Sequence, residues 1–575
     1  MKRVFTLIGC ALLAWSAAAQ NSWQDALLFA ENQYGGTARS VGMGEALTAI
    51  GGDLGSLTFN PAGSAVPSYS QIAFTGGLSY NLAVAQGDGS GSGFGDPVKT
   101  GYLRAKMPNI GFTMNMDTGR RHGLKRMSFS FLSNSTADYT LRMNASGVNA
   151  NNSYAGAVAS SAAGYPESAL ASGGWYTLDD NAASYGLLWR DIAAYRSGII
   201  GTINGQMVGL TDWIKGNGET APLGSLRQQY GFQSKGYKHD MLLNWALDFS
   251  DVFYVGANIG LVTMAYGQSE YWYEAPESAA EFPDVPFEEN EHARFQSLQM
   301  KSVYEAKGSG VYFKLGMLWR PVAGLRLGAA IQTPTIMNIT TRPGDYAEAH
   351  VDGVRLTPCQ TPDDAQDTFS FVSPFRVNGG LAYSFGNVAV LSADYEGVNY
   401  GMSYFQPRSE NVDFYTSNPY VDTNADIKDV LGWSHMARVG LEVKPVPFLA
   451  LRAGYNLTTS GQHSFLEWVD GGDGKEYLRV FELTAQERAS LMKHAFSLGV
   501  GFSSSGSFYA DAALRYRLVP SDTFVPYTYY TYDTQSANRF AYQEKVEDTN
   551  PLLQCAAIRA NYYPIEAMLT VGWRF

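Results

Sequence analysis

The sequence predicts an all-β protein, a transmembrane antiparallel β-barrel of about 14 strands, on three observations. Segments of strand length alternate between apolar residues and polar or small residues along most of the chain. The connections between these segments alternate between short and long, as in bacterial outer-membrane barrels, where periplasmic turns are tight and extracellular loops are long. Beyond residue 20, no apolar run approaches the ~18 residues that a membrane-spanning helix requires.

The composition of the 575-residue chain agrees with a β protein that faces a membrane. Charged residues make up 16% of it, where roughly 25% is usual in soluble domains. The 36 tyrosines suit a boundary between water and hydrocarbon. With a formal net charge of −12, the chain lacks the excess of positive charge that is typical of nucleic-acid-binding proteins, so no nucleic-acid partner is expected.

Residues 1–19 have the pattern of a secretory signal peptide, with two basic residues, the apolar run 4–15 and small residues at 16–19. The mature chain would begin at Gln20. Lipidation at Cys10 is the alternative, but cleavage there would leave an apolar core far shorter than the ~7–15 residues that export needs. The segment therefore predicts export, and the barrel pattern predicts the outer membrane of a Gram-negative cell as the destination.

The C-terminal strand shows the period-two pattern most clearly. Phe575, Trp573 and Val571 fall on one face, and Arg574 and Gly572 fall on the other. The same pattern recurs at residues 243–249, 253–261, 311–319, 325–331, 375–383, 437–443, 449–455, 496–502 and 508–516, with weaker candidates at 71–82, 106–116, 124–134 and 388–398.

The connections fall into a short class and a long class. Short connections are predicted at residues 117–123, 250–251, 321–324, 386–387, 446–447 and 503–506, and long ones at about 83–105, 135–237, 266–308, 335–372, 400–433, 459–492 and 520–560. These thirteen connections join fourteen strands and place both chain ends on the periplasmic side.

Alternation also assigns a face to each charged residue of the strands. In hydrocarbon each unpaired backbone group costs several kcal/mol, so a membrane-spanning sheet must close, with an apolar outer face and its charges inside. The inward set is Arg376, Asp394, Glu396, Arg438, Glu442, Arg452, Asp511 and Arg515. Because neighbouring strands then offer opposite charges, we expect cross-strand ion pairs. A secreted β-sandwich or solenoid would alternate too, but one polar and one apolar face on nearly every strand favours the barrel.

Aromatic clusters lie just beyond several predicted strand ends. They are Tyr271-Trp272-Tyr273 and the group Tyr527, Tyr529, Tyr530 and Tyr532. Such positions are typical of the aromatic girdles of membrane barrels, so these rings are expected at the membrane surface.

A glycine-rich segment precedes the first strand. It contains Gly42 and Gly44, a Gly-Gly-Asp triplet at 51–53, and then Asn60, Pro61, Ala62 and Gly63. This segment resembles the N-terminal plug of the FadL/TodX family of outer-membrane transporters for long-chain fatty acids and hydrocarbons, in which Asn-Pro-Ala is the most recognisable short motif. The strand number and the terminal Phe575 extend the resemblance over essentially the whole mature chain.

The resemblance implies a plug at 20–67 and a barrel at 68–575. These follow the signal peptide at 1–19, and the strand pattern places the largest extracellular loop at about 135–237. It implies passive uptake of hydrophobic compounds, with long-chain fatty acids as the expected ligand, captured by loops and passed to a pocket beside the plug. In the family, the ligand is thought to leave sideways through a gap in the wall. The implied partners are hydrophobic small molecules, outer-membrane lipid and the barrel-assembly machinery, which would recognise Phe575.

Three alternatives stay open at this stage. The N-terminal segment could be a flexible extension in the periplasm. The barrel could serve to display its large loops as an adhesive or structural surface protein. It could also be an aqueous pore for small polar solutes.

One loop segment fits ligand capture. Two aspartates at 179–180 could cap a helix in which Tyr185, Leu188, Ile192 and Tyr195 fall on one stripe. Such a stripe could line a groove for an apolar ligand, or it could pack the loop's own core.

No catalytic or metal-binding pattern stands out. The seven histidines lack the close spacing of a zinc site, and neither a nucleophile elbow nor a phosphate-binding loop is present. We therefore expect no enzyme activity, no cofactor and no metal. Cys359 and Cys555 remain after signal cleavage and are too few for a disulfide framework, although their pairing is left open.

Overall fold

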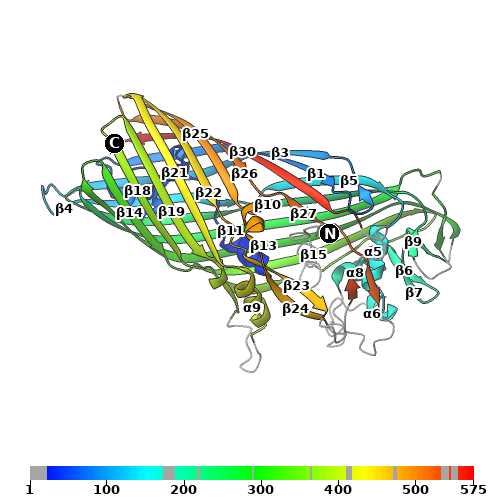
Figure 1. Ribbon diagram of the computed structural model, residues 1–575. Helices are drawn as coiled ribbons and strands as arrows, with labels where there is room; N and C mark the ends of the chain where they lie inside the picture. The colour runs from blue at the N-terminus through cyan, green and yellow to red at the C-terminus, as the bar shows by residue number, and fades with distance from the viewer. Residues whose placement is uncertain are drawn as a thin grey trace.

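The computed structural model describes residues 22–171, 188–215, 220–280, 282–287, 290–362, 366–408, 418–470, 476–504, 506–532, 543–545 and 555–575. Fourteen antiparallel strands close into one barrel, which confirms the predicted fold class (Figure 1). The predicted signal peptide lies outside the described residues.

The wall strands follow the chain round the barrel. They are β1 (Gln71–Gly87), β3 (Val98–Asp117), β4 (Leu124–Asp138) with β5 (Leu141–Asn149), β10 (Leu226–Phe249), β11 (Phe253–Pro276), β13 (Asn290–Val322), β14 (Leu325–Gln332) with β15 (Ile336–Asp352), β17 (Asp367–Val372) with β18 (Arg376–Phe385), β19 (Ala389–Asn399) with β20 (Tyr404–Pro407), β21 (Trp433–Val446), β22 (Leu449–Thr458), β25 (Lys493–Ser503), β26 (Phe508–Leu518) with β27 (Asp522–Phe524), and β30 (Ile558–Arg574). Two labels joined by "with" mark one wall strand that is interrupted once. β30 pairs with β1 from Gln71↔Arg574 to Gly87↔Ile558, and this pairing closes the barrel.

The short turns and the C-terminus gather at one end of the barrel, on the left in Figure 1. Neighbouring turns are joined by backbone hydrogen bonds, for example from the amide of Arg320 to the carbonyl of Val252 (2.8 Å). The amide of Phe575 donates to the carbonyl of Ser70 (3.0 Å), so the chain enters and leaves the barrel at the same end. The predicted alternation of short and long connections is therefore confirmed.

The exterior of the barrel carries an apolar band. On β1, the outward side chains of Ile72, Phe74 and Leu78 are 43–50% exposed, whereas Ala73 and Thr75 alternate with them and are buried. A band of this kind is stable in contact with lipid chains, because the strand ladder pairs the backbone groups of the wall, apart from one edge of the upper part of β3. The barrel therefore spans a membrane.

Exposed rings border this band, but they are not the ones that the sequence suggests. Trp433 is 50% exposed on the outer wall, whereas Trp272, Tyr527 and Tyr529 are at most 8% exposed. The predicted girdle role is wrong for these three residues. The reason is that β11 continues past the membrane, so that residues placed near its end lie among the extracellular loops, where Trp272 stacks on Tyr154 at a centroid distance of 4.7 Å.

The strands extend further on one side of the barrel than the alternation predicts. β13 has 33 residues and β10 and β11 have 24 each, whereas β22 has 10. Parts of the loops predicted at 135–237, 266–308 and 335–372 are therefore strand, and the longest connection spans residues 150–225. Above the membrane the outer face of a strand meets water while its inner face packs against the loops, so the ladder continues where the outer face is no longer apolar.

Small elements cover the extracellular end. They are β2 (Gly93–Phe94), α5 (Tyr154–Ala162), α6 (Glu167–Ala171), α8 (Trp189–Arg196), β6 (Ile200–Ile203), β7 (Gln206–Gly209), β8 (Asp212–Ile214), β9 (Thr220–Pro222), β12 (Val285–Phe287), β16 (Cys359–Gln360), η3 (Tyr400–Met402), α9 (Val421–Val430), β23 (Ser464–Asp470), β24 (Glu476–Glu482), α10 (Ala485–Ser490), β28 (Tyr530–Tyr532) and β29 (Gln543–Lys545). Among the described helices, none has the length and apolar character to cross a membrane. Cys359 and Cys555 are both free thiols.

The N-terminal residues lie inside the barrel. They form α2 (Trp23–Ala30), α3 (Ala38–Gly42), α4 (Ser56–Phe59) and η2 (Pro61–Ala65). Their contacts reach inward-facing groups on strands all round the wall: the amide of Ala38 donates to Thr570 of β30, that of Thr48 to Asp394 of β19, and the hydroxyl of Ser64 to Asn244 of β10. The chain then leaves the lumen at the short-turn end to enter β1.

Candidate functional site

Helix α2 begins at a capping box. The hydroxyl of Ser22 accepts from the amide of Asp25, and the carboxylate of Asp25 accepts from the amide of Ser22 (3.0 Å), so two of the free donors at the helix start are satisfied. Asp25 is also the acceptor of a hydrogen bond from the hydroxyl of Tyr304 (3.2 Å). Burial raises the pKa of Asp25 to about 7, although the hydrogen bonds from Ser22 and Tyr304 lower it.

One face of α2 packs against aromatic rings of the wall. Phe29 lies edge-on to Phe371 at 5.6 Å between ring centroids, and it also contacts Phe369 and Phe405. The opposite face, with Trp23, Leu27 and Leu28, points into open space above the helix. The helix therefore serves as the floor of a cavity.

The C-terminal end of α2 is held by donors from three wall strands. Tyr139 donates to the carbonyl of Leu28 (3.2 Å), and the ammonium of Lys238 donates to the carbonyls of Phe29 (3.0 Å) and Glu31 (2.7 Å). The guanidinium of Arg376 donates to the carbonyl of Ala30. Cations at this end also complement the helix dipole, so the floor is fixed in both position and direction.

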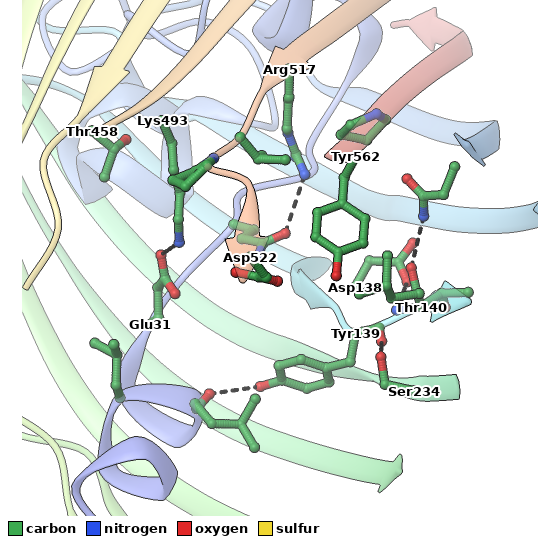
Figure 2. Close-up of a pocket in the computed structure, with 18 of the residues that line it drawn as sticks. Glu31, Asp138, Tyr139, Thr140, Ser234, Thr458, Lys493, Arg517, Asp522 and Tyr562 are labelled. Atoms are coloured by element: carbon green, nitrogen blue, oxygen red, sulfur yellow. Dashed lines mark hydrogen bonds and ion pairs between the residues drawn. The ribbon is translucent and has the colours of Figure 1, made fainter. Parts of the chain in front are cut away.

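The cavity above α2 has a volume of about 580 Å³, which is enough for a drug-sized or lipid-sized apolar molecule (Figure 2). Its apolar lining comes from α2 and from the extracellular halves of the wall strands. This lining includes Trp23, Leu27, Leu28, Tyr139, Leu141, Met143, Tyr230, Phe232, Tyr266, Phe524 and Tyr562. The aromatic share of this lining favours a hydrophobic occupant.

Two cations line one side of the cavity, Lys493 on β25 and Arg517 on β26, and the acids Glu31, Asp138 and Asp522 also belong to its lining (Figure 2). Lys493 forms an ion pair with Glu31, just beyond the end of α2. The guanidinium of Arg517 donates to the amide oxygen of Gln33 (3.2 Å) and lies 3.5 Å from the carboxylate of Glu566. This side of the cavity is suited to the polar end of an amphiphile, because Lys and Arg are the residues that bind carboxylates.

The wall is open beside the cavity. β3 pairs with β4 only from Asn109↔Asn134 downward, and β5 pairs with β10 from Leu226↔Asn149 to Ser234↔Leu141. In the described part of the chain, no backbone ladder joins the extracellular half of β3 to β5. The far end of β5 pairs with the two residues of β2 on this side. Side chains bridge this gap instead, such as Arg104 of β3, whose guanidinium donates to the carboxylate of Asp138 (3.0 Å).

Below α2, the inward charges form ion pairs, as alternation predicts. Arg376 and Arg438 both bind Glu396 (2.9 and 2.5 Å), and Arg452 bridges Glu442 (2.7 Å) and Asp511 (2.6 Å). The predicted cross-strand pairing is therefore confirmed.

The N-terminal segment joins the same network. Arg39 binds Glu442 at 2.9 Å, Glu45 binds Arg515, and the hydroxyl of Tyr34 donates to Glu396 (2.9 Å). Wall and segment thus share one set of buried charges. None of these arginines is left over for a ligand near the middle of the lumen among the described residues.

The glycines that the sequence singled out lie where the segment touches the wall backbone. A Cβ on Gly44 would lie 2.7 Å from the amide nitrogen of Tyr455, and Gly44 has φ +60°. A Cβ on Gly42 would lie 3.2 Å from the Cα of Gly499. Only glycine fits this close approach, so both residues serve the docking of the segment.

The Asn-Pro-Ala-Gly motif also docks the segment. The amide group of Asn60 donates to the carbonyls of Thr48 (2.8 Å) and Met317 (2.9 Å), while its oxygen accepts from the amide of Ala62 (3.1 Å). Pro61 begins η2, where a missing donor costs nothing. The carbonyl of Gly63 accepts from the amide of Gly52, and none of these motif residues lines the cavity.

The predicted capture stripe is described only in part. Tyr185 and the capping pair 179–180 lie outside the described residues. Leu188 precedes α8, Ile192 is 7% exposed in the extracellular core, and Tyr195 packs against that core. A role in ligand capture stays a prediction.

Comparison with known proteins returned matches among solved structures. No known family profile matches the sequence, and no curated protein does. A FadL homologue from Pseudomonas aeruginosa aligns over 95% of this chain and 99% of its own, with 13% identity and a TM-score of 0.47. The chain resembles the FadL/TodX family in structure.

Two further structures show the same likeness. The toluene transporter TodX of P. putida covers 94% of this chain and 99% of its own, at 11% identity and a TM-score of 0.43. The toluene transporter TbuX of Ralstonia pickettii covers 94% and 98%, at 11% identity and a TM-score of 0.42. At these identities the likeness concerns the fold alone.

Sequence reasoning missed the residues that build the cavity. The capping box at Ser22 and Asp25, followed by Leu27 and Leu28, is a visible helix signal that could have located the floor. Tyr139 and Lys238 carry no such signal, because they fall within a stretch whose alternation is weak. Among the described residues, no group of three His, Cys, Asp or Glu side chains is placed to hold a metal.

Proposed function

We propose that this protein is an outer-membrane transporter, not an enzyme, that takes up hydrophobic compounds passively, with long-chain fatty acids as the first ligand class to test. The observation that carries the proposal is the cavity of about 580 Å³, which is lined by aromatic and aliphatic side chains and has cations on one side. A molecule with an apolar chain and a carboxylate matches both parts of this lining.

The N-terminal residues 20–67 act in this proposal as a plug. Support comes from the burial of most of residues 22–67 inside the barrel and from the shared ion pairs at Arg39 and Glu45. In this proposal the plug closes the lumen, so the ligand leaves by another route. Conductance of small ions through the purified protein in planar bilayers would favour the alternative of an aqueous pore.

The exit in this proposal is the interval between β3 and β5. The cavity reaches this gap, because Thr140 and Leu141, at the start of β5, line the cavity together with Asn81. Side-chain bridges such as Arg104 to Asp138 can open without breaking a backbone ladder. A ligand would therefore pass from the cavity into the outer leaflet without crossing the plug.

The test is binding of a fluorescent long-chain fatty acid to the detergent-purified full chain. We expect saturable binding that Leu28→Glu weakens at least about tenfold, because a charge would then face the apolar lining. Leu478→Glu is the matched control, since Leu478 lies on β24, is exposed and does not line the cavity. Absence of binding, or equal loss in both variants, would refute the proposal. Tight cell adhesion without lipid binding would support the display alternative.

A further inference from the structure

A cationic hollow lies on the outer wall of the barrel, beside the interval between β3 and β5. Its volume is about 370 Å³. Arg142, Lys235 and Lys307 line it from β5, β10 and β13, and all three are exposed. Among the described residues that line it, Glu305 is the only acid, with its carboxylate 3.7 Å from the ammonium of Lys307. The hollow therefore carries a net positive charge.

Strand register explains both the depth and the charge of this hollow. Lys235 pairs with Gly267, and Gly267 pairs with Glu305, while Ala265 pairs with Lys307. The small residues of β11 leave the sheet bare between long side chains from its two neighbours. The stem of Lys235 lies over Gly267, where a Cβ would be 3.6 Å from the Lys235 Cε. The result is a shallow recess with ammonium groups at its rim.

The hollow lies at the upper edge of the apolar band. On β10, Tyr237 is the next outward residue below Lys235 and is 42% exposed, and Met241 follows further down. On β13, Val311 is an exposed outward residue below Lys307. Arg342 pairs with Glu305 and adds another exposed cation at this level. A lipid whose chains lie along these apolar residues would hold its head group at the hollow.

We propose that the hollow binds the phosphate of an anionic lipid head group in the outer leaflet. Ammonium and guanidinium groups form charge-assisted hydrogen bonds with phosphate oxygens, and clustered cations at a membrane surface attract anionic lipids. Gly267 adds no side chain of its own, so the head group can approach the wall beside the stem of Lys235. The proposal requires the membrane placement of the barrel but not its transport function, so each can fail without the other.

The test is native mass spectrometry of the full chain in detergent, titrated with diphosphorylated lipid A and, separately, with phosphatidylcholine. We expect lipid A to bind with a preference over phosphatidylcholine. Lys235→Gln with Lys307→Gln should weaken this binding roughly tenfold to thirtyfold, because two cations at the head group are lost. Arg120→Gln with Arg121→Gln removes the same charge from an exposed turn at the opposite end and should leave binding unchanged. Lys235→Arg with Lys307→Arg should restore it.

The outcomes separate the possible readings. Equal lipid A binding by the glutamine variant and the wild type would overturn the proposal. Displacement of lipid A by an excess of inorganic phosphate would show a site for free phosphate and would overturn the assignment to a lipid. A migration shift on heating, as folded barrels show in gels, confirms that each variant is folded before it is compared. Fatty-acid binding in the cavity should be the same in all of them.

Discussion

The lower lumen, where residues 37–66 meet the wall, is filled by ion pairs and backbone contacts, whereas the upper lumen above α2 holds a cavity of about 580 Å³. The two regions use different residue types. Below, arginines, carboxylates and glycines bring the segment against the strands, and above, aromatic and aliphatic side chains leave space between them. The comparison teaches that one barrel can combine a packed lower lumen with a cavity above it, through a change of side chains along the same strands.

The largest expected effect comes from breaking the charge network of the lower lumen at Glu396. This carboxylate binds Arg376 and Arg438 and accepts from Tyr34, and it is 1% exposed. Glu396→Gln leaves two buried arginines short of a counter-charge, so we expect a loss of about 3–5 kcal/mol in the free energy of unfolding. Urea unfolding of the purified barrel measures this. A loss below about 1 kcal/mol would mean that water, not the pairing, satisfies these charges.

The next effect comes from adding volume at the contact between segment and wall. A Cβ on Gly454 would lie 2.0 Å from the backbone nitrogen of Gly44, so Gly454→Val must push the segment away from the wall, at a cost of about 1–3 kcal/mol or more. Limited proteolysis should then cut within residues 35–66. Gly379→Val is the control, because no atom lies within 4 Å of its added Cβ. Equal protection of both variants would show that the segment does not depend on this close approach.

These two sites also show what the sequence could predict. Period two determines which residues of a strand face inward, so the buried pairing of Arg376 with Glu396 and of Arg452 with Glu442 follows from alternation and strand order. The pairing of Arg452 with Asp511 does not, because it reaches across β25. Gly42 and Gly44 stand out in the sequence because they belong to a glycine-rich segment, and few roles other than close approach to another backbone explain so many glycines. In the upper lumen, the capping box of α2 is a helix signal that the sequence shows. The position of this helix as a floor could not be predicted, since it depends on Tyr139, Lys238 and Arg376, which lie far apart in the chain.

The upper lumen should respond to pH through Asp25. Burial raises the pKa of this carboxyl to about 7, from an ordinary value of 3.8. A carboxyl with a raised pKa in the folded state contributes its full stability below about pH 4, and that contribution is lost as the pH rises through about 7. Hydrogen exchange of residues 23–30, corrected for intrinsic rates, should therefore speed up between about pH 5 and pH 8.

The matched variants sharpen this expectation. Asp25→Asn should remove the extra pH dependence of α2, because no charge then has to be buried. Asp88→Asn, at an exposed loop position, should keep it. An unchanged pH profile in Asp25→Asn would mean that another group controls the helix.

The smallest effect is expected at the rim of the cavity. The ion pair of Lys493 with Glu31 has side chains that are 38% and 25% exposed, so Lys493→Gln should cost less than about 1 kcal/mol in the free energy of unfolding. Its effect on the affinity for a fatty acid should be larger than its effect on stability, if this side of the cavity meets the carboxylate. A comparison of the acid with its methyl ester in wild type and variant measures this. Equal affinities for acid and ester in the wild type would exclude a carboxylate contact.

The central claim is that a hydrophobic ligand occupies the upper lumen above α2. The most direct measurement is a crystal structure of the full chain soaked with a terminally brominated long-chain fatty acid, with the bromine located by anomalous scattering. The account predicts a bromine peak inside the cavity bounded by Trp23, Tyr139 and Tyr562. A peak confined to the outer wall or to detergent, with an empty cavity, would contradict it.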